Sequence, residues 1–202
     1  MNIVPTNVNY TYSLFRKNLI ELNLTFPFIN VQVIGNSTLG KNIYAIKLGK
    51  GPKKVFYSGS YHGNEWICSV LLMKFIENYC DAFVSNSSLY NQNIPDLFNS
   101  TSIFIVPMVN PDGVDLVTGG LSIDSYAYER ALTISNNFPE IPFPSGWKAN
   151  INGVDFSNFQ HTLLINRLDW RLLCLIILFS KFLHILFFHY LLIYYHLLYL
   201  ND

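Results

Sequence analysis

The apolar positions of the first 80 residues change their period twice. Between residues 10 and 26 they recur at helical spacing, and the pattern ends near Pro27, so this stretch predicts a helix. The spacing is helical again after His62, which predicts a mostly buried helix over 65–80. Between these helices lie three short runs rich in β-branched and aromatic residues, separated by turns that contain glycine. They predict consecutive strands over 29–38, 41–49 and 53–60.

The middle of the chain continues the alternation of strands and helices. Residues 81–99 are polar and contain a proline, which indicates a surface connection. Residues 100–113, STSIFIVPMVNPDG, hold a long apolar run that closes on a turn, as in a strand buried on both faces of a mainly parallel sheet. One further helix is predicted over 124–138 with Asp124 as its cap, and the rest of 114–144 as loop. The pattern predicts an α/β domain: a mainly parallel mixed sheet with helices on both faces.

The last part of the chain has a different composition. Residues 172–200 contain one Lys and three His among large apolar residues, whereas the preceding part is an ordinary globular mixture. We therefore expect two parts, 1–160 and a hydrophobic tail at 161–202. A span of about 20 such residues could cross a bilayer as a C-terminal helix. Lys181 near its centre would cost about 2.5–3.5 kcal/mol on insertion scales.

Charge and cysteine content narrow the class of protein. The 202 residues carry 13 acidic and 13 basic side chains, with no Lys/Arg cluster longer than a pair, so no nucleic acid partner is expected. The three cysteines include no CxxC, which argues against a disulfide framework or a thiolate zinc site. The N-terminus, MNIVPTNVNY, has neither the basic nor the apolar region of a secretory signal. Synthesis in the cytoplasm is expected, and the final compartment stays unknown.

Candidate chemistry lies at the connection YSGSYHGNEW, residues 57–66, between a predicted strand and a predicted helix. His62 and Glu65 are three residues apart there, so both side chains can point to one side at the end of the sheet where α/β folds keep their sites. Imidazole nitrogen and carboxylate oxygen are ligands of zinc, and the pair could supply two of the usual three protein ligands of a catalytic zinc. Alternatively, the His caps the helix and the Glu occupies its first turn, where the helix dipole favours an acid.

Two further segments extend this pattern: VNPDG at 109–113, directly after the buried strand, and GWKANINGVDF at 146–156. Together with HGNEW, in this order, they resemble the zinc carboxypeptidase family, and GWKANINGVD is similar to its bacterial branch of γ-D-glutamyl-diaminopimelate peptidases. The resemblance covers residues 8–156. It implies a Zn²⁺-dependent peptidase whose substrate is a peptide, in that branch the stem peptide of peptidoglycan.

The resemblance also implies roles for individual residues. His62 and Glu65 match the family's first two zinc ligands, and Asp155 matches an acid that hydrogen-bonds the first of them. Arg130 matches an Arg that polarises the scissile carbonyl and stabilises the oxyanion. Two plainer interpretations stay open: Asp155 could cap a turn, and Arg130 could be a solvated charge on a helix. In NPDG, Pro and Gly are expected to shape a turn whose backbone Asp112 satisfies.

The match to the family ends after Asp155. The chain continues FSNFQH, with Ser157 and Asn158 where the family carries Asn and, in carboxypeptidases proper, the Arg that binds the substrate's C-terminal carboxylate. No Glu follows Glu140 to serve as general base. No segment resembles the strand that bears the family's third ligand, so we expect little or no turnover from this chain. The histidines that could substitute are His161, His184, His189 and His196.

Two origins of the tail are open: a membrane anchor, with membrane contact through 172–200, or a reading frame lost just after the NGVD segment. The abrupt end of the resemblance at Phe156 favours the second. A different functional class is a non-catalytic, membrane-tethered module that binds cell-wall peptides without zinc. An unstable remnant that aggregates through its apolar tail is a third interpretation.

Overall fold

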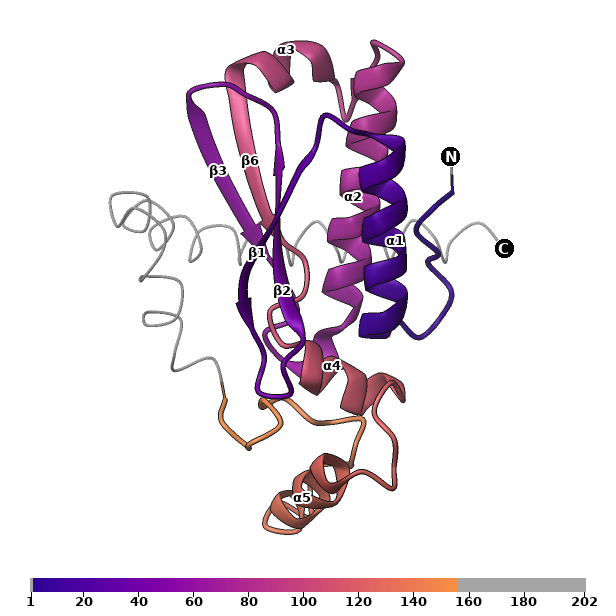
Figure 1. Cartoon of the computed structure of the whole chain (residues 1–202), viewed down its shortest axis with the longest axis vertical. Coiled ribbons are helices and arrows are strands. Elements are labelled where there is room, and N and C mark those ends of the chain that lie inside the picture. The colour runs from indigo at the N-terminus through magenta and orange to yellow at the C-terminus, as the bar shows by residue number, and fades with distance from the viewer. Residues whose placement is uncertain (1, 156–202) are drawn as a thin grey trace. The chain divides into compact units, whose positions relative to one another are not determined.

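The structure is a computed structural model that describes residues 2–155. These residues form a mixed sheet with strand order β1-β2-β6-β3, flanked by helices (Figure 1). The strands are β1 (Asn30–Asn36), β2 (Asn42–Leu48), β3 (Lys53–Ser58) and β6 (Thr101–Val106), and a separate small ribbon pairs β4 (Ser88–Leu89) with β5 (Gln92–Asn93). The helices are α1 (Tyr12–Thr25), α2 (Ile67–Val84), α3 (Ile94–Ser100), α4 (Pro111–Thr118) and α5 (Tyr126–Ser135), with a short 3-10 helix, η1, at Gly63–Glu65.

The first helix, the three strands after it and the second long helix all form where the hydrophobic pattern predicts them. Helix α1 begins at Thr11, whose hydroxyl accepts a hydrogen bond from the Leu14 N–H at 3.2 Å, a common N-cap arrangement. Strand β6 is almost entirely buried, as its continuous apolar run predicts.

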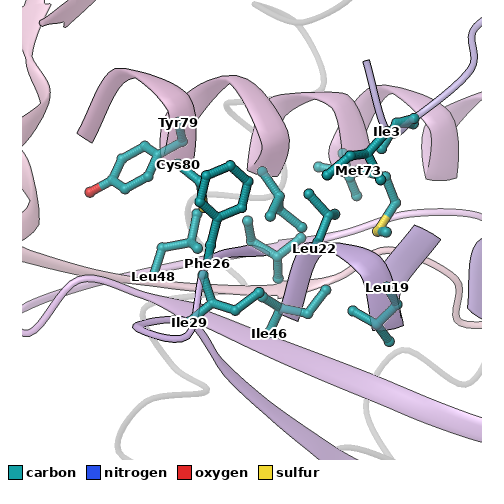
Figure 2. Close-up of a cluster of buried hydrophobic side chains, with 14 of the residues drawn as sticks. Ile3, Leu19, Leu22, Phe26, Ile29, Ile46, Leu48, Met73, Tyr79 and Cys80 are labelled. Carbon is teal, nitrogen blue, oxygen red and sulfur yellow. The ribbon is translucent and has the colours of Figure 1, made fainter. Parts of the chain in front are cut away.

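The hydrophobic core lies between the sheet and the two long helices. Helices α1 and α2 run side by side on one face of the sheet (Figure 1). Leu22 of α1, Ile46 of β2 and Met73 of α2 are each 0% exposed and belong to one cluster of buried side chains (Figure 2). Fully burying side chains of this size stabilises a fold by about 1.5–3 kcal/mol each. The amphipathic faces of α1 and α2 are therefore what hold the sheet in place.

The α/β class and the mixed sheet are confirmed, but the prediction of a mainly parallel sheet is wrong for the described residues. Strand β1 pairs with β2, and β2 with β6, in antiparallel fashion, and only β3 and β6 run parallel. The reason is the tight turn between β1 and β2, where Gly40 has a φ of 78° that reverses the chain directly. Both long helices of the described part lie on the same face of the sheet, not on opposite faces.

Two short helices replace predicted loops. Helix α3 forms inside the stretch predicted as a surface connection, and α4 forms from NPDG and the residues after it. Each begins with an asparagine cap: Asn93 accepts from the Asp96 N–H at 2.9 Å, and Asn110 from the Gly113 N–H at 3.0 Å. Each also has a proline in its first turn, where the missing N–H costs nothing.

Asp112 was predicted to satisfy the backbone of its own turn. Instead, its side chain binds the turn between β1 and β2. Its carboxylate accepts from the Leu39 N–H at 2.9 Å and pairs with Lys41 at 3.3 Å. Asp115, one helical turn further on, pairs with Lys41 at 2.7 Å and accepts from the Tyr12 N–H, also at 2.7 Å. This buried charge cluster connects α4 to the β1–β2 turn and to the start of α1.

Helix α5 confirms the predicted third helix but begins one residue later than its predicted cap. Ser125, and not Asp124, is the N-cap, and its hydroxyl accepts from the Tyr128 N–H at 3.2 Å. A second, smaller cluster of buried side chains packs beneath α5 and includes Leu116, Ala131 and Trp147.

The N-terminal segment is fastened to α2 by a buried carboxylate. Glu77 is 0% exposed and accepts hydrogen bonds from the backbone N–H groups of Ile3 at 2.8 Å and Val4 at 3.1 Å. Lys74, one turn earlier in α2, pairs with the same carboxylate at 2.9 Å. These partners compensate for the loss of hydration when the Glu77 carboxylate is buried in the apolar core.

The hydrophobic tail lies outside the described residues, and so do the predicted boundary at 160 and the histidines proposed as substitutes. Within residues 2–155, no helix is both long enough and apolar enough to span a bilayer.

Candidate metal centre

The candidate site lies where the parallel strands β3 and β6 end. Their pairing continues past the strands themselves, because the Val109 N–H donates to the Gly59 carbonyl and the Asn110 N–H to the Ser60 carbonyl, each at 3.0 Å. The two connections that follow, toward η1 and toward α4, therefore leave the sheet side by side. Carboxyl ends of adjacent parallel strands are the usual location of sites in α/β proteins.

Ser60 turns the chain from β3 toward the His62 loop. Its φ is 54°, in the left-handed region that residues other than glycine seldom occupy. The Ser60 hydroxyl donates to the Glu65 carbonyl at 3.1 Å and lies 2.7 Å from the Ser69 hydroxyl, which in turn donates to the Pro107 carbonyl. A buried hydroxyl network thus fixes the start of η1 against the end of β6.

The structure brings together three of the four predicted site residues. Nδ1 of His62 lies 2.9 Å from Oε1 of Glu65, and Nε2 on the other side of the ring lies 3.4 Å from Oδ1 of Asp155. The His62 side chain is 20% exposed, whereas those of Glu65 and Asp155 are 49% and 44% exposed. The ring is thus held between two partly exposed carboxylates.

A backbone segment ahead of Asp155 packs directly against the His62 loop. The Gly63 N–H donates to the Lys148 carbonyl at 3.1 Å, and the Asn64 N–H donates to the Trp147 carbonyl at 2.9 Å. These two bonds hold GWKANINGVD beside HGNEW, although the two motifs lie far apart along the chain. The resemblance that linked the motifs in sequence is matched by their contact in space.

The fourth predicted residue, Arg130, is on the exposed surface of α5. Within the described residues, no hydrogen bond or ion pair connects it to His62 or Glu65. Its role at the scissile carbonyl stays a prediction.

Cys68 and Tyr61 lie close to the candidate ligands, and both are held in their neutral forms. Burial raises the pKa of the Cys68 thiol, and the negative charge of Glu65 raises it further. Burial also raises the pKa of Tyr61, although a hydrogen bond to Ser58 opposes this effect. Neither side chain therefore offers a second anion beside Glu65 near neutral pH.

The imidazole of His62 and the carboxylate of Glu65 are donor types that zinc accepts. Two atoms bound at 2.0–2.2 Å to one tetrahedral zinc lie about 3.3 Å apart, and the Nδ1 and Oε1 atoms already lie 2.9 Å apart. The pairing of Nε2 with Asp155 directs Nδ1 toward Glu65, and a metal-binding histidine usually has a carboxylate or carbonyl at its other ring nitrogen in the same way. Within residues 2–155, no group of three or more His, Cys, Asp or Glu side chains could hold a metal ion.

Comparisons with known proteins identify relatives of this chain. A family model described as zinc carboxypeptidase matches residues 16–158. The chain is 37% identical over 156 residues to gamma-D-glutamyl-L-diamino acid endopeptidase 1 of Lysinibacillus sphaericus, covering 77% of this chain and 39% of that protein. It is 38% identical over 150 residues to the uncharacterized protein YqgT of Bacillus subtilis (strain 168), covering 73% and 39%. The chain thus spans about two fifths of the length of these relatives.

A solved structure shows the same fold. The crystal structure of thrombin activatable fibrinolysis inhibitor superposes with a TM-score of 0.50 at 15% identity, over 74% of this chain and 33% of that one. The mixed sheet, with an imidazole and a carboxylate paired at its strand ends, places the protein in the α/β class. More specifically, the chain belongs to the zinc carboxypeptidase family, as its motifs predicted.

The structural importance of Asn110 was not predicted from the sequence. This residue was part of a motif interpreted as a turn, yet it caps α4 and is only 2% exposed. The available signal was an asparagine directly before a proline, a pairing typical of a helix start.

Proposed function

We propose that His62 and Glu65 bind zinc in a site that hydrolyses a peptide bond. The observation that carries this proposal is the His62 ring, which faces Glu65 through Nδ1 and Asp155 through Nε2. Membership of the zinc carboxypeptidase family supports it.

Each residue of the site has a separate task in this proposal. His62 and Glu65 bind the metal, and Asp155 accepts the Nε2–H of His62 so that Nδ1 keeps its lone pair for the metal. Bound zinc supplies Lewis acidity toward a carbonyl oxygen and toward water. Arg130 is proposed to stabilise the negative charge that develops on the scissile carbonyl oxygen.

The proposed substrate is a cell-wall peptide that contains a γ-D-glutamyl-diaminopimelate bond. The name of the Lysinibacillus sphaericus relative, a gamma-D-glutamyl-L-diamino acid endopeptidase, supports this class of substrate. Similarity of the segment GWKANINGVD to the same branch points in the same direction.

The test of the metal site is a zinc titration of the purified chain, compared with Glu65→Ala. Removing one of two ligands from this part of the chain should raise the dissociation constant by at least about tenfold. Glu21→Ala, which removes an exposed glutamate from α1, is the matched control and should leave the affinity unchanged. Equal zinc affinity for wild type and Glu65→Ala would refute the proposed site.

For the 202-residue chain itself we propose little or no turnover, because the proposal assigns two zinc ligands, His62 and Glu65, where a catalytic zinc usually has three, and no Glu follows Glu140 to act as general base. The measurement is release of product from a γ-D-glutamyl-diaminopimelate peptide by the zinc-loaded protein, followed by mass spectrometry. Turnover that disappears in His62→Ala would contradict the expected inactivity while supporting the proposed chemistry.

A further inference from the structure

Asn110 connects the two segments that carry His62 and Asp155. Its side-chain amide nitrogen donates to the Tyr61 carbonyl and to the Ala149 carbonyl, both at 3.0 Å. Tyr61 directly precedes His62, and Ala149 belongs to the segment that accepts hydrogen bonds from the His62 loop. Both amide hydrogens of Asn110 are therefore used to bridge segments that lie 49 and 39 residues from it in sequence.

The backbone segments around this bridge pack closely. A Cβ atom on Gly63 would lie 2.5 Å from the Gly113 carbonyl oxygen, and one on Gly113 would lie 2.5 Å from the amide nitrogen of Asn110. The two glycines let the His62 loop and the start of α4 approach until their backbones touch. Asn110 then fills the junction and donates to the Tyr61 and Ala149 carbonyl groups.

The bridge extends from Ala149 to Asp155 through a compact loop. The Asn150 side chain accepts hydrogen bonds from the N–H groups of Asn152 and Val154, both at 3.0 Å. The Asn150 N–H donates to the Val154 carbonyl at 2.9 Å, which closes the loop one residue before Asp155. Ala149 and Asp155 thus lie at the two ends of one hydrogen-bonded loop.

We propose that Asn110 is a positioning residue that sets the His62 loop against the segment ending in Asp155. This inference rests on the proposed function of His62 and Glu65 as zinc ligands. Asn110 touches neither of them, and it acts by holding the two backbone segments at the separation their side chains require. Its capping of α4 is a second role, which the Oδ1 atom performs alone.

Two variants separate these roles. Asn110→Asp and Asn110→Ser both keep an oxygen that can cap α4, because Asp and Ser are good N-cap residues, and both remove the bridging amide hydrogens. Asp adds a charge at the junction and Ser does not, so an effect shared by both arises from the lost bridge. Asn93→Asp is the matched control, since Asn93 caps α3 through the same kind of bond, away from the site.

The first readout is hydrogen exchange of the Gly63 and Asn64 amides in the metal-free protein, measured by NMR. Loss of the bridge should accelerate both by about tenfold in the two Asn110 variants, while Met73 and Ile105 in the core keep their protection. Unchanged exchange at Gly63 and Asn64 would overturn the proposal. So would equal loss of protection at the core amides, because Asn110 would then support the whole fold and not this junction.

The second readout is the zinc dissociation constant, which should rise by about tenfold in both Asn110 variants and stay unchanged in Asn93→Asp. If wild type binds no zinc, the proposed function fails, yet the exchange comparison still decides whether Asn110 fixes the loop. Faster exchange with unchanged zinc affinity would show that the junction does not position the ligands and would overturn the inference.

Discussion

Asp155 faces the side of the His62 ring opposite to Glu65, with its Oδ1 atom 3.4 Å from Nε2. A carboxylate in this place orients the ring and raises its basicity toward a metal. Because the Asp155 side chain is 44% exposed, solvent screens its charge. Its effect on zinc affinity should therefore lie near the lower end of the usual range of about 10–100-fold.

We predict that Asp155→Asn raises the zinc dissociation constant by about tenfold without lowering the melting temperature. An amide preserves the shape of the side chain but not its negative charge. The measurement is a zinc titration beside thermal unfolding, with Asp124→Asn, an exposed aspartate before α5, as control. The predicted orienting role would be wrong if Asp155→Asn bound zinc as tightly as wild type.

At the residue scale, local spacing made His62 and Glu65 candidates, because they lie three residues apart in one connection between a strand and a helix, but the family resemblance was needed to prefer zinc ligands over a helix cap. Asp155 required the resemblance to a family, since nothing near it in sequence indicates a histidine partner. The proline after Asn110 indicates a helix cap, but its bridging role could not be recognised, because the side chain acts on carbonyl groups of distant segments. Every residue carries the same backbone carbonyl group, so residue types do not indicate which carbonyl a side chain binds.

At the scale of elements, Lys41 is the single cation between two aspartates of α4. Its Nζ atom lies 3.3 Å from Asp112 and 2.7 Å from Asp115, whose side chains are 2% and 6% exposed. Two buried carboxylates side by side would repel one another without this lysine. The cluster joins three elements that meet next to the candidate site.

We predict that Lys41→Met lowers the free energy of unfolding by about 3 kcal/mol, because it leaves two buried charges without their cation. Methionine retains most of the apolar volume of the lysine stem, so lost packing contributes little. Urea unfolding measures the change, and Lys53→Met at the exposed start of β3 serves as control. A loss as small as that of the control would mean that solvent screens the cluster.

Helices long enough to show a periodic pattern of apolar residues were predicted, and short helices were not. Helices α1 and α2 span 14 and 18 residues, long enough for a helical repeat of apolar positions to appear. Helices α3 and α4 have 7 and 8 residues, about two turns, so only their caps and prolines could have indicated them. The antiparallel placement of β2 beside β6 was also not predictable, because strand direction depends on long-range pairing.

At the scale of the whole molecule, the core contains acids that must stay protonated. Burial raises the pKa of Tyr79 to about 12. Burial, assisted by the nearby negative charge of Asp81, raises the pKa of Cys80 to about 12. Both side chains are 0% exposed, so their ionised forms would lack hydration in the native state.

We predict that the protein loses stability in alkali. Above about pH 9 the unfolded chain gives up the Cys80 proton while the native state keeps it until about pH 12, so stability falls as pH rises through this window. Tyr79 adds the same effect above about pH 10, and each group contributes about 1.4 kcal/mol per pH unit.

Urea unfolding between about pH 8 and pH 11 measures this slope. Cys80→Ala should make the slope shallower by one proton. A slope that Cys80→Ala leaves unchanged would assign the alkaline loss to other groups.

The attachment of the N-terminal segment to Glu77 has a consequence for synthesis on the ribosome. Ile3 is translated 74 residues before Glu77, an interval of several seconds at about 5–20 residues per second. During this interval the backbone of Ile3 and Val4 has no carboxylate to bind, and their apolar side chains are accessible to chaperones. The residues that are translated earliest therefore cannot complete their native contacts until Glu77 has been synthesised.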